Sequence, residues 1–214
     1  MKVLHIVTTL SLLAVILGSS AATAQQISNP EELDEKVRLF LEENQGKWRD
    51  LNVPYEDGKV LYDIIVKNNY RSALEIGTST GHSTVWMAWA LSKTGGKLVT
   101  VEIDETRQKE AISNLEKAGL SHLVDFRLGD AHEIVKEVPG PFDFVFSDAD
   151  KFWYVQYFKD VDPKLIKGGC FTAHNVLQGQ RGIAEYLDYV KSLSGYTTTI
   201  DRSSSSGIAI SYKK

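Results

Sequence analysis

The chain has 214 residues, of which 43% are hydrophobic and 24% are charged, and its formal net charge is −4 at pH 7. This length and composition suit one globular domain with a core of ordinary size. The negative charge and the absence of any run of Lys or Arg argue against a nucleic-acid-binding surface, so we expect no nucleic-acid partner.

Residues 1–24 have the pattern of a secretory signal peptide. Lys2 gives a short positive start, residues 6–17 are mainly apolar, and Ala22-Thr23-Ala24 supplies the small residues of a cleavage site. We expect export to the periplasm or the outside of the cell, with a mature chain that starts at Gln25. The apolar run is too short to span a bilayer comfortably, so we expect no stable membrane span after processing. An uncleaved N-terminal anchor is the alternative.

Residues 25–55 are predicted to form an N-terminal helical arm, and residues 56–214 the main domain. Asn29-Pro30 begins a helix, because Asn caps free N–H groups and Pro suits the first helical position. Apolar residues such as Leu33 and Val37 then recur at helical spacing, so the arm is expected to pack on the main domain. The same helix is a candidate contact for a homodimer.

From residue 71 onward, short apolar strands alternate with amphipathic helices. This alternation predicts an α/β fold with a doubly wound, Rossmann-like sheet that is mostly parallel and has helices on both faces. Residues 196–200 and 207–212 read as a closing hairpin, which makes the C-terminal strand antiparallel. The other predicted strands are 72–76, 97–102, 122–127, 142–148 and 169–174, and the predicted helices of the main domain are 56–69, 81–92, 105–118, 131–137, 153–166 and 180–193.

A turn of small residues joins the first predicted strand to the next helix. Gly77 and Gly81 allow the backbone to turn sharply and to approach a ligand closely. Glu102 closes the following strand about 20 residues later, near the spacing at which a carboxylate accepts the hydroxyls of a ribose. Together these features predict a nucleoside-cofactor site at the carboxyl ends of parallel strands.

The charge of the turn favours one cofactor. A dinucleotide site has the pattern G-x-G-x-x-G, because the pyrophosphate lies against the helix N-terminus, whereas this turn is G-x-x-x-G with Ser79 at the middle position. Glu75, at the end of the strand, would repel a pyrophosphate but would suit a sulfonium group. The pattern therefore favours S-adenosylmethionine, and an NAD-dependent oxidoreductase is the disfavoured alternative.

Charged and polar residues also follow the fourth and fifth predicted strands. Asp148, Asp150 and Lys151 come after the fourth strand, and His174-Asn175 ends the fifth. The carboxyl ends of parallel strands meet at one edge of the sheet, where ligands bind. A carboxylate, an imidazole and an amide oxygen make Asp148, His174 and Asn175 a candidate divalent metal site. A solvated Asp–Lys loop and a structural histidine are the plainer interpretations.

Two further features have simpler explanations. Trp153, Tyr154 and Tyr157 could wall an aromatic acceptor, or could be the buried stripe of the helix that contains them, and both interpretations stay open. Cys170 is the only cysteine and lies in an apolar strand pattern, so we expect a buried structural thiol.

From about Leu51 to its C-terminus, the chain resembles the metal-dependent, class I S-adenosylmethionine O-methyltransferases. This group includes catechol O-methyltransferase and caffeoyl-CoA O-methyltransferase. The matching segments, in chain order, are Asn52-Val53, residues 74–84, residues 101–104, Gly129-Asp130-Ala131, residues 148–151 and residues 174–176.

The resemblance implies a role for each matching residue. Glu102 would bind the ribose, and Asp130 with Ala131 would border the adenine. Lys151 would be the catalytic residue that accepts a proton from the substrate hydroxyl. The resemblance thus implies an S-adenosylmethionine-dependent O-methyltransferase for a small hydroxylated, catechol-like acceptor, with a divalent cation held by Asp148, His174 and Asn175. The residues expected at the cofactor are Val53, Glu75, Gly77, Thr78, Gly81, Ser83, Glu102, Asp130, Ala131 and Asp148.

One position departs from the family's pattern. His174 stands where the family has an aspartate, and replacing a carboxylate by imidazole disfavours Mg²⁺. The site would then bind a softer cation such as Zn²⁺, Mn²⁺ or Fe²⁺, or would bind no cation. His174 and the predicted export also keep open an exported S-adenosylmethionine-binding protein that has lost catalysis, although Lys151 and Asp148 oppose that alternative.

Overall fold

The computed structural model of this chain describes residues 29–48 and 50–214. The predicted signal peptide, residues 1–24, lies outside the described residues. Among the residues that are described, no helix combines the length and the apolar character needed to cross a membrane.

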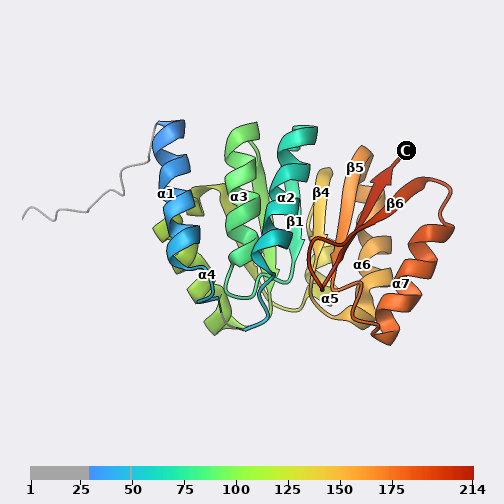
Figure 1. Cartoon of the computed structure of the whole chain (residues 1–214). Coiled ribbons are helices and arrows are strands. Elements are labelled where there is room, and N and C mark those ends of the chain that lie inside the picture. The colour runs from blue at the N-terminus through green and yellow to red at the C-terminus, as the bar shows by residue number, and fades with distance from the viewer. Residues whose placement is uncertain (1–28, 49) are drawn as a thin grey trace, which may run out of the picture.

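In the described part of the chain, seven strands form one mixed sheet in the order β3-β2-β1-β4-β5-β7-β6 (Figure 1). The first five strands in this order are parallel to their neighbours, and β7 runs antiparallel between β5 and β6. The predicted doubly wound sheet and its antiparallel C-terminal strand are therefore confirmed. The strands are β1 Ser72–Ile76, β2 Lys97–Glu102, β3 Val124–Leu128, β4 Phe142–Ser147, β5 Leu165–His174, β6 Tyr196–Asp201 and β7 Ile208–Lys213.

Helices cover both faces of this sheet. The buried side chains of α1 to α4 pack on one face, and those of α5 to α7 pack on the other. The helices are α1 Pro30–Glu43, α2 Tyr55–Asn68, α3 His82–Thr94, α4 Glu105–Ala118, α5 Ala131–Glu137, α6 Tyr154–Val161 and α7 Arg181–Ser192.

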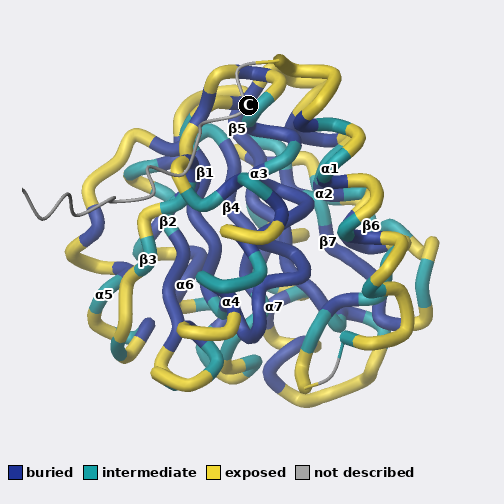
Figure 2. The backbone as a smooth tube through the Cα atoms, turned by 90° about the vertical axis from the view of Figure 1, so that its left-hand side faces the viewer, coloured by how far each residue is buried: buried dark blue, intermediate teal, exposed yellow. Residues whose placement is uncertain are grey.

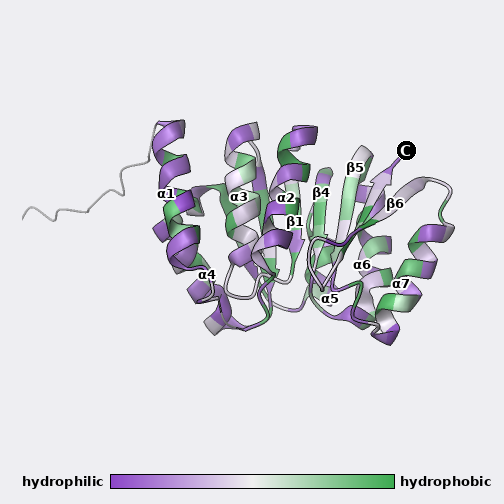
Figure 3. Ribbon diagram, viewed as in Figure 1, coloured by the Kyte–Doolittle hydropathy of each residue, from purple (hydrophilic) through white to green (hydrophobic). Residues whose placement is uncertain are grey.

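Alternating side chains of the central strands supply the two halves of the core. In β4, Phe144 and Phe146 pack with α2 and α3, whereas Val145 packs with the α5–α7 side. Successive side chains of a strand point to opposite faces, so a strand that is covered on both faces is apolar throughout. Figure 2 shows the buried tube of the central strands, and Figure 3 shows their apolar colouring between helices that are polar on the outside.

The N-terminal arm begins as predicted. The Asn29 side chain accepts a hydrogen bond from the Glu31 backbone N–H at 3.1 Å, with Pro30 at the first position of α1. Leu33, Val37 and Leu41 are buried in a cluster with residues of α3 and α4, so the apolar stripe of α1 is used within the chain. The candidate homodimer contact of this helix stays a prediction.

Several predicted boundaries differ from the structure, among them the start of the strand expected over 169–174, which begins at Leu165. The helix expected over 153–166 is only α6, because a 3₁₀ turn over Asp162–Lys164 follows it and β5 begins at Leu165. Pro163 lacks the N–H that a continued helix would need. The third strand begins at Val124 rather than at residue 122, since residues 121–123 form another 3₁₀ turn.

Candidate active site

A cavity of about 720 Å³ opens at the carboxyl ends of the parallel strands. This is the edge of a doubly wound sheet where ligands bind, and the cavity is large enough for a nucleoside cofactor beside a small acceptor. The residues expected from the sequence that line it are Gly77, Glu102, Asp130, Ala131, Asp148, Lys151, His174 and Asn175. The other expected residues, Val53, Glu75, Thr78, Gly81 and Ser83, are not part of its lining.

The turn after β1 brings the backbone of Gly77 against the loop after β4. Gly77 has φ +101°, and a Cβ atom there would lie 3.0 Å from the carbonyl oxygen of Asp148 and from the backbone nitrogen of Ala149. Only glycine fits both the conformation and this close approach. Gly81, with φ +96°, is the residue immediately before α3. Gly77 thus lets the β1 turn approach the loop after β4 where both border the cavity.

Glu75 lies behind the turn rather than in the cavity. Its carboxylate is fully buried and accepts hydrogen bonds from the hydroxyls of Ser83 at 2.5 Å, Thr84 at 2.7 Å and Thr100 at 2.6 Å. Burial raises the pKa of Glu75 to about 7, although these hydrogen bonds oppose the shift. Glu75 therefore ties β1, β2 and α3 together beneath the cofactor pocket.

The remaining residues outside the lining support the same turn. The Thr78 hydroxyl is hydrogen-bonded to that of Thr100 at 2.5 Å. The carbonyl oxygen of Val53 lies 2.8 Å from Nδ1 of the buried His82. Burial lowers the pKa of His82 to about 4, so this ring is neutral at physiological pH.

Glu102 ends β2 at the wall of the cavity. Its Oε2 atom accepts the backbone N–H of Ser79 at 2.7 Å, and its Oε1 atom accepts those of Ile103 and Asp104, both at 3.0 Å. These bonds hold the carboxylate of Glu102 against the backbone of the turn that follows β1. A carboxylate has about four acceptor sites, so capacity for a ligand hydroxyl remains.

A loop that precedes α2 covers the β1 turn, and its contribution was not predicted in full. Asp50 forms an ion pair with Arg107 at 2.6 Å and accepts the Ser79 hydroxyl through its backbone oxygen at 2.8 Å. Asn52 donates to the Thr80 hydroxyl at 2.7 Å. Leu51, Asn52 and Arg107 line the cavity. The sequence signal for this part of the site was the matching segment Asn52-Val53 alone.

Asp130 and Ala131 begin α5 at another part of the cavity. The Asp130 side chain caps the helix by accepting the backbone N–H of His132 at 2.9 Å. The ring of His132 stacks on Trp153, with ring centroids 3.7 Å apart. His132 also lines the cavity, and sequence reasoning did not single it out.

Lys151 reaches the cavity from the loop after β4. Its Nζ atom donates to Oδ1 of Asp148 at 2.6 Å and contacts the carbonyl oxygens of Asp148 and Ala149 at 3.3 and 3.2 Å. The predicted Asp–Lys pair is therefore present, and it lies in the candidate site rather than in an open loop.

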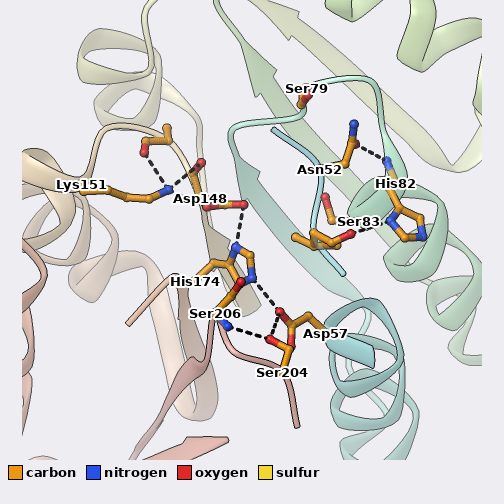
Figure 4. A network of polar contacts seen from close by, with 12 residues as sticks. Asn52, Asp57, Ser79, His82, Ser83, Asp148, Lys151, His174, Ser204 and Ser206 are labelled. Carbon is orange, nitrogen blue, oxygen red and sulfur yellow. Dashed lines mark hydrogen bonds and ion pairs between the residues drawn. The ribbon is translucent and has the colours of Figure 1, made fainter. Parts of the chain in front are cut away.

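His174 lies between two carboxylates at the end of β5 (Figure 4). Its Nδ1 atom is 3.0 Å from Oδ2 of Asp148, and its Nε2 atom is 2.7 Å from Oδ2 of Asp57. Burial alone would lower the pKa of His174, but the hydrogen bonds and charges of the two carboxylates outweigh it and raise the pKa to about 9. The ring is therefore an imidazolium at neutral pH and donates from both nitrogens.

Asp57 was not among the residues expected at the site. It lies fully buried in the first turn of α2, where Oδ2 also accepts the hydroxyl of Ser204 at 2.7 Å. The sequence did offer one sign of this role. Asp57 lies on the same helix face as the apolar Leu61 and Ile64, which places a carboxylate on the face that packs against the core.

The arrangement does not fit a divalent cation at Asp148, His174 and Asn175. An imidazole coordinates metal through a nitrogen lone pair, and both ring nitrogens of His174 are engaged by carboxylates. Both oxygens of Asp148 are engaged as well, by Lys151 and by His174. Within residues 29–48 and 50–214, no three His, Cys, Asp or Glu side chains form a group that could hold a metal ion.

Trp153, just before α6, and the tyrosines of α6 divide between the two interpretations left open. Tyr154 is buried in the core, and its hydroxyl lies 3.3 Å from the carbonyl oxygen of His174. Tyr157 is also buried but lines the cavity, and Trp153 is partly buried beside His132. Cys170 is buried, as expected, and burial raises the pKa of its thiol.

The fold and this cavity define a Rossmann-like methyltransferase domain, and comparison with known proteins gives the family. A family model described as O-methyltransferase matches residues 23–189. The chain therefore belongs to this O-methyltransferase family.

Three individual relatives share between 28% and 37% of their aligned residues with this chain. The chain is 37% identical over 139 residues to a catechol O-methyltransferase of Niastella koreensis, and 31% identical over 136 residues to caffeoyl-CoA O-methyltransferase 1 of Arabidopsis thaliana. These matches cover 63% and 61% of this chain, but only 62% and 52% of the relatives. The solved O-methyltransferase TomG of Streptomyces achromogenes, in complex with SAM, superposes with a TM-score of 0.70 at 28% identity, covering 86% of this chain and 90% of that one.

Proposed function

We propose that this protein is an S-adenosylmethionine-dependent O-methyltransferase that acts on a small hydroxylated, catechol-like acceptor. The observation that carries the proposal is that Glu102 and Lys151 line the same cavity, on either side of the Gly77 turn that approaches the Asp148 backbone. The site thus combines a carboxylate that would accept hydrogen bonds from a ribose with an amine that would take the proton of a reacting hydroxyl.

The cofactor would lie along the carboxyl ends of β1, β2 and β4. Glu102 would accept the ribose hydroxyls, and Asp130 with Ala131 would border the adenine. The glycine turn would let the methionine part approach the backbone, and a positively charged sulfonium nearby would favour the ionised form of the buried Glu75. The cofactor supplies an activated methyl group when it is bound.

Lys151 has the position of a general base. In its neutral form the Nζ atom would take the proton of the acceptor hydroxyl. The acceptor oxygen would then form a bond to the methyl carbon while the carbon–sulfur bond breaks and its electron pair stays on sulfur. The products would be a methyl ether, S-adenosylhomocysteine and an ammonium group on Lys151. Most of the acceleration would come from holding the two reactants in line.

Calorimetric titration and an activity assay test this proposal together. The purified protein is titrated with S-adenosylmethionine, S-adenosylhomocysteine and NAD, and is then assayed for methyl transfer to a panel of catechols and monophenols. Saturable binding of the first two ligands only, with methyl transfer to a hydroxylated acceptor, is the expected result. Binding of NAD alone would point instead to an oxidoreductase.

A second candidate function is an exported S-adenosylmethionine-binding protein without catalysis. The observation that favours it is the imidazolium of His174 at a position where the resembling family carries a carboxylate. Tight binding of the cofactor without methyl transfer to any acceptor of the panel would support this alternative. Export itself, with cleavage after Ala24, remains part of the proposal.

A further inference from the structure

We infer that the hydrogen-bonded series Asp57–His174–Asp148 takes the place of a divalent cation in this protein, so that methyl transfer here is independent of metal. Metal-independent methyl transfer rests on the proposed function. The exclusion of the metal does not: we expect the site to take up no Mg²⁺, Mn²⁺ or Zn²⁺. Figure 4 shows the series, with His174 in the middle and Lys151 at the far side of Asp148.

The hydrogen bonds at His174 run from the ring to its two carboxylate partners. An ionised carboxylate has only acceptor atoms, so a ring placed between two carboxylates donates through both nitrogens. Distances of 3.0 Å to Asp148 and 2.7 Å to Asp57 are those of such bonds. A ring that donates on both sides has no lone pair left for a metal.

Asp148 already has a partner on each carboxylate oxygen. Its Oδ1 atom is held by Lys151 and its Oδ2 atom by His174, so a cation would have to displace both positively charged partners. The displaced groups would stay close by, because both side chains are largely buried and enter from the adjoining loop and strand. Two positive charges beside an incoming dication repel it strongly in a site of low dielectric.

The His174 ring is held in place and cannot turn away to admit a metal ion. Asp57 is fully buried, and rotation of the ring would leave its carboxylate without its charged partner. The α2 backbone is itself fixed at this point, because Gly58 packs directly against the ring of Trp86. Ser204, from the loop between β6 and β7, donates its hydroxyl to the same Oδ2 atom of Asp57 that faces His174.

The series also supplies what the site would otherwise lack. Asp57, His174, Asp148 and Lys151 alternate in charge, so the buried carboxylates are balanced without an added ion. His174 and Lys151 both line the cavity, and once Lys151 has taken the acceptor's proton both would be positive groups that stabilise negative charge on the acceptor oxygen. The residues of the chain itself thus provide the positive charge that a cation would bring.

Titration of wild type and of two variants at position 174 with metal ions tests the inference. Wild type, His174→Asp and the matched control His174→Asn are dialysed against EDTA, loaded with S-adenosylhomocysteine, and titrated calorimetrically with Mg²⁺, Mn²⁺ and Zn²⁺. We expect no saturable binding by wild type. We expect Mg²⁺ to bind His174→Asp at least about tenfold more tightly than His174→Asn, because the two variants differ by one carboxylate charge.

Methyl transfer after EDTA treatment gives a second measurement on wild type. The rate should change by less than about twofold on EDTA treatment and on re-addition of each ion, because no reacting group depends on metal. Stoichiometric binding of any of the three ions by wild type, or activity that EDTA abolishes and an ion restores, would overturn the inference. Both results come from wild type, so they hold even if His174→Asp does not fold.

The proposed function fails in a different way from the inference. If S-adenosylhomocysteine does not bind, or no acceptor is methylated with or without metal, the proposed function is wrong. The titration of wild type with the metal ions still decides whether the series excludes a cation.

Discussion

The Nε2 atom of His174 lies 2.7 Å from Oδ2 of Asp57, a residue 117 positions earlier in the chain. This bond joins the first turn of α2 to the end of β5, where His174 lines the candidate active site. A second buried histidine, His82, shows how strongly partners decide the state of a ring. His82 lies between a carbonyl oxygen and the indole N–H of Trp86, so one nitrogen donates and the other accepts, and the ring is neutral. His174 has two carboxylates and is charged.

Removing the carboxylate of Asp57 should strongly destabilise the protein. The variant Asp57→Ala leaves the buried imidazolium of His174 with one partner and releases Ser204, so we expect a loss of about 3–5 kcal/mol in the free energy of unfolding. Urea denaturation of the ligand-free protein measures it. The control is Asp63→Ala on the same helix, where the ion pair with Lys59 is exposed and a change within about 0.5 kcal/mol is expected. Equal losses in the two variants would contradict the role of Asp57.

The part of the site that lies at strand ends could be predicted from the sequence. Gly77, Glu102, Asp148 and Lys151 each follow or end an apolar strand, and parallel strands bring their carboxyl ends to one edge. Local pattern is enough for such residues, because a strand and the loop after it keep the same relation in every doubly wound sheet.

The residues that decide the state of His174 could not be predicted in the same way. Asp57 comes from a helix before the first strand, and Ser204 comes from a loop near the C-terminus. Their places depend on how α2 and the β6–β7 hairpin pack against the sheet, which no local spacing encodes. The expectation of His174 as a metal ligand rested on its residue type, its place at the end of a strand and the family resemblance, none of which encodes the two carboxylates that its ring nitrogens face.

Replacing Glu102 should weaken cofactor binding. The variant Glu102→Ala would lose charge-assisted hydrogen bonds to the ribose, which are worth about 1.5–3 kcal/mol each, so we expect at least about tenfold weaker binding of both S-adenosylmethionine and S-adenosylhomocysteine for each lost bond. Calorimetry measures both affinities. Glu116→Ala makes the same charge change at an exposed position of α4 and should leave them unchanged. Unaltered affinity in Glu102→Ala would rule out the ribose role.

Replacing Lys151 should slow the reaction without loss of the cofactor. For Lys151→Met we expect kcat to fall by about 10²- to 10⁴-fold, the usual contribution of a general base, and the affinity for S-adenosylhomocysteine to stay within about twofold. Lys167→Met, at an exposed position of β5, is the control and should keep normal kcat. If Lys151→Met keeps wild-type turnover, the proton has another acceptor.

The signal-peptide prediction concerns residues that lie outside the described part of the chain. We expect protein isolated from its native host to begin at Gln25, because Ala22-Thr23-Ala24 follows the apolar run at the position of a cleavage site. N-terminal sequencing of fractionated cells measures the start and the compartment. A chain that begins at Met1 in the cytoplasm would show that the segment is not a signal peptide.

The buried Glu75 should make the stability of the protein depend on pH. Burial raises its pKa from 4.5 to about 7 in the folded protein. Between these values the unfolded chain loses the proton while the folded chain keeps it, so the free energy of unfolding falls as pH rises through this window. Below the window the carboxyl is protonated in both states, and above it both states are ionised, so the contribution is constant there.

The comparison with Glu75→Gln isolates this effect, because the amide does not titrate and has nearly the same volume. The stability of wild type relative to Glu75→Gln should fall by about 3 kcal/mol between about pH 5 and about pH 8. Urea denaturation at several pH values within that range measures both proteins, without cofactor, since a bound ligand would itself add stability. A difference in stability that does not change with pH would mean that Glu75 is already ionised in the folded protein at pH 5, and that its three hydroxyl partners outweigh its burial.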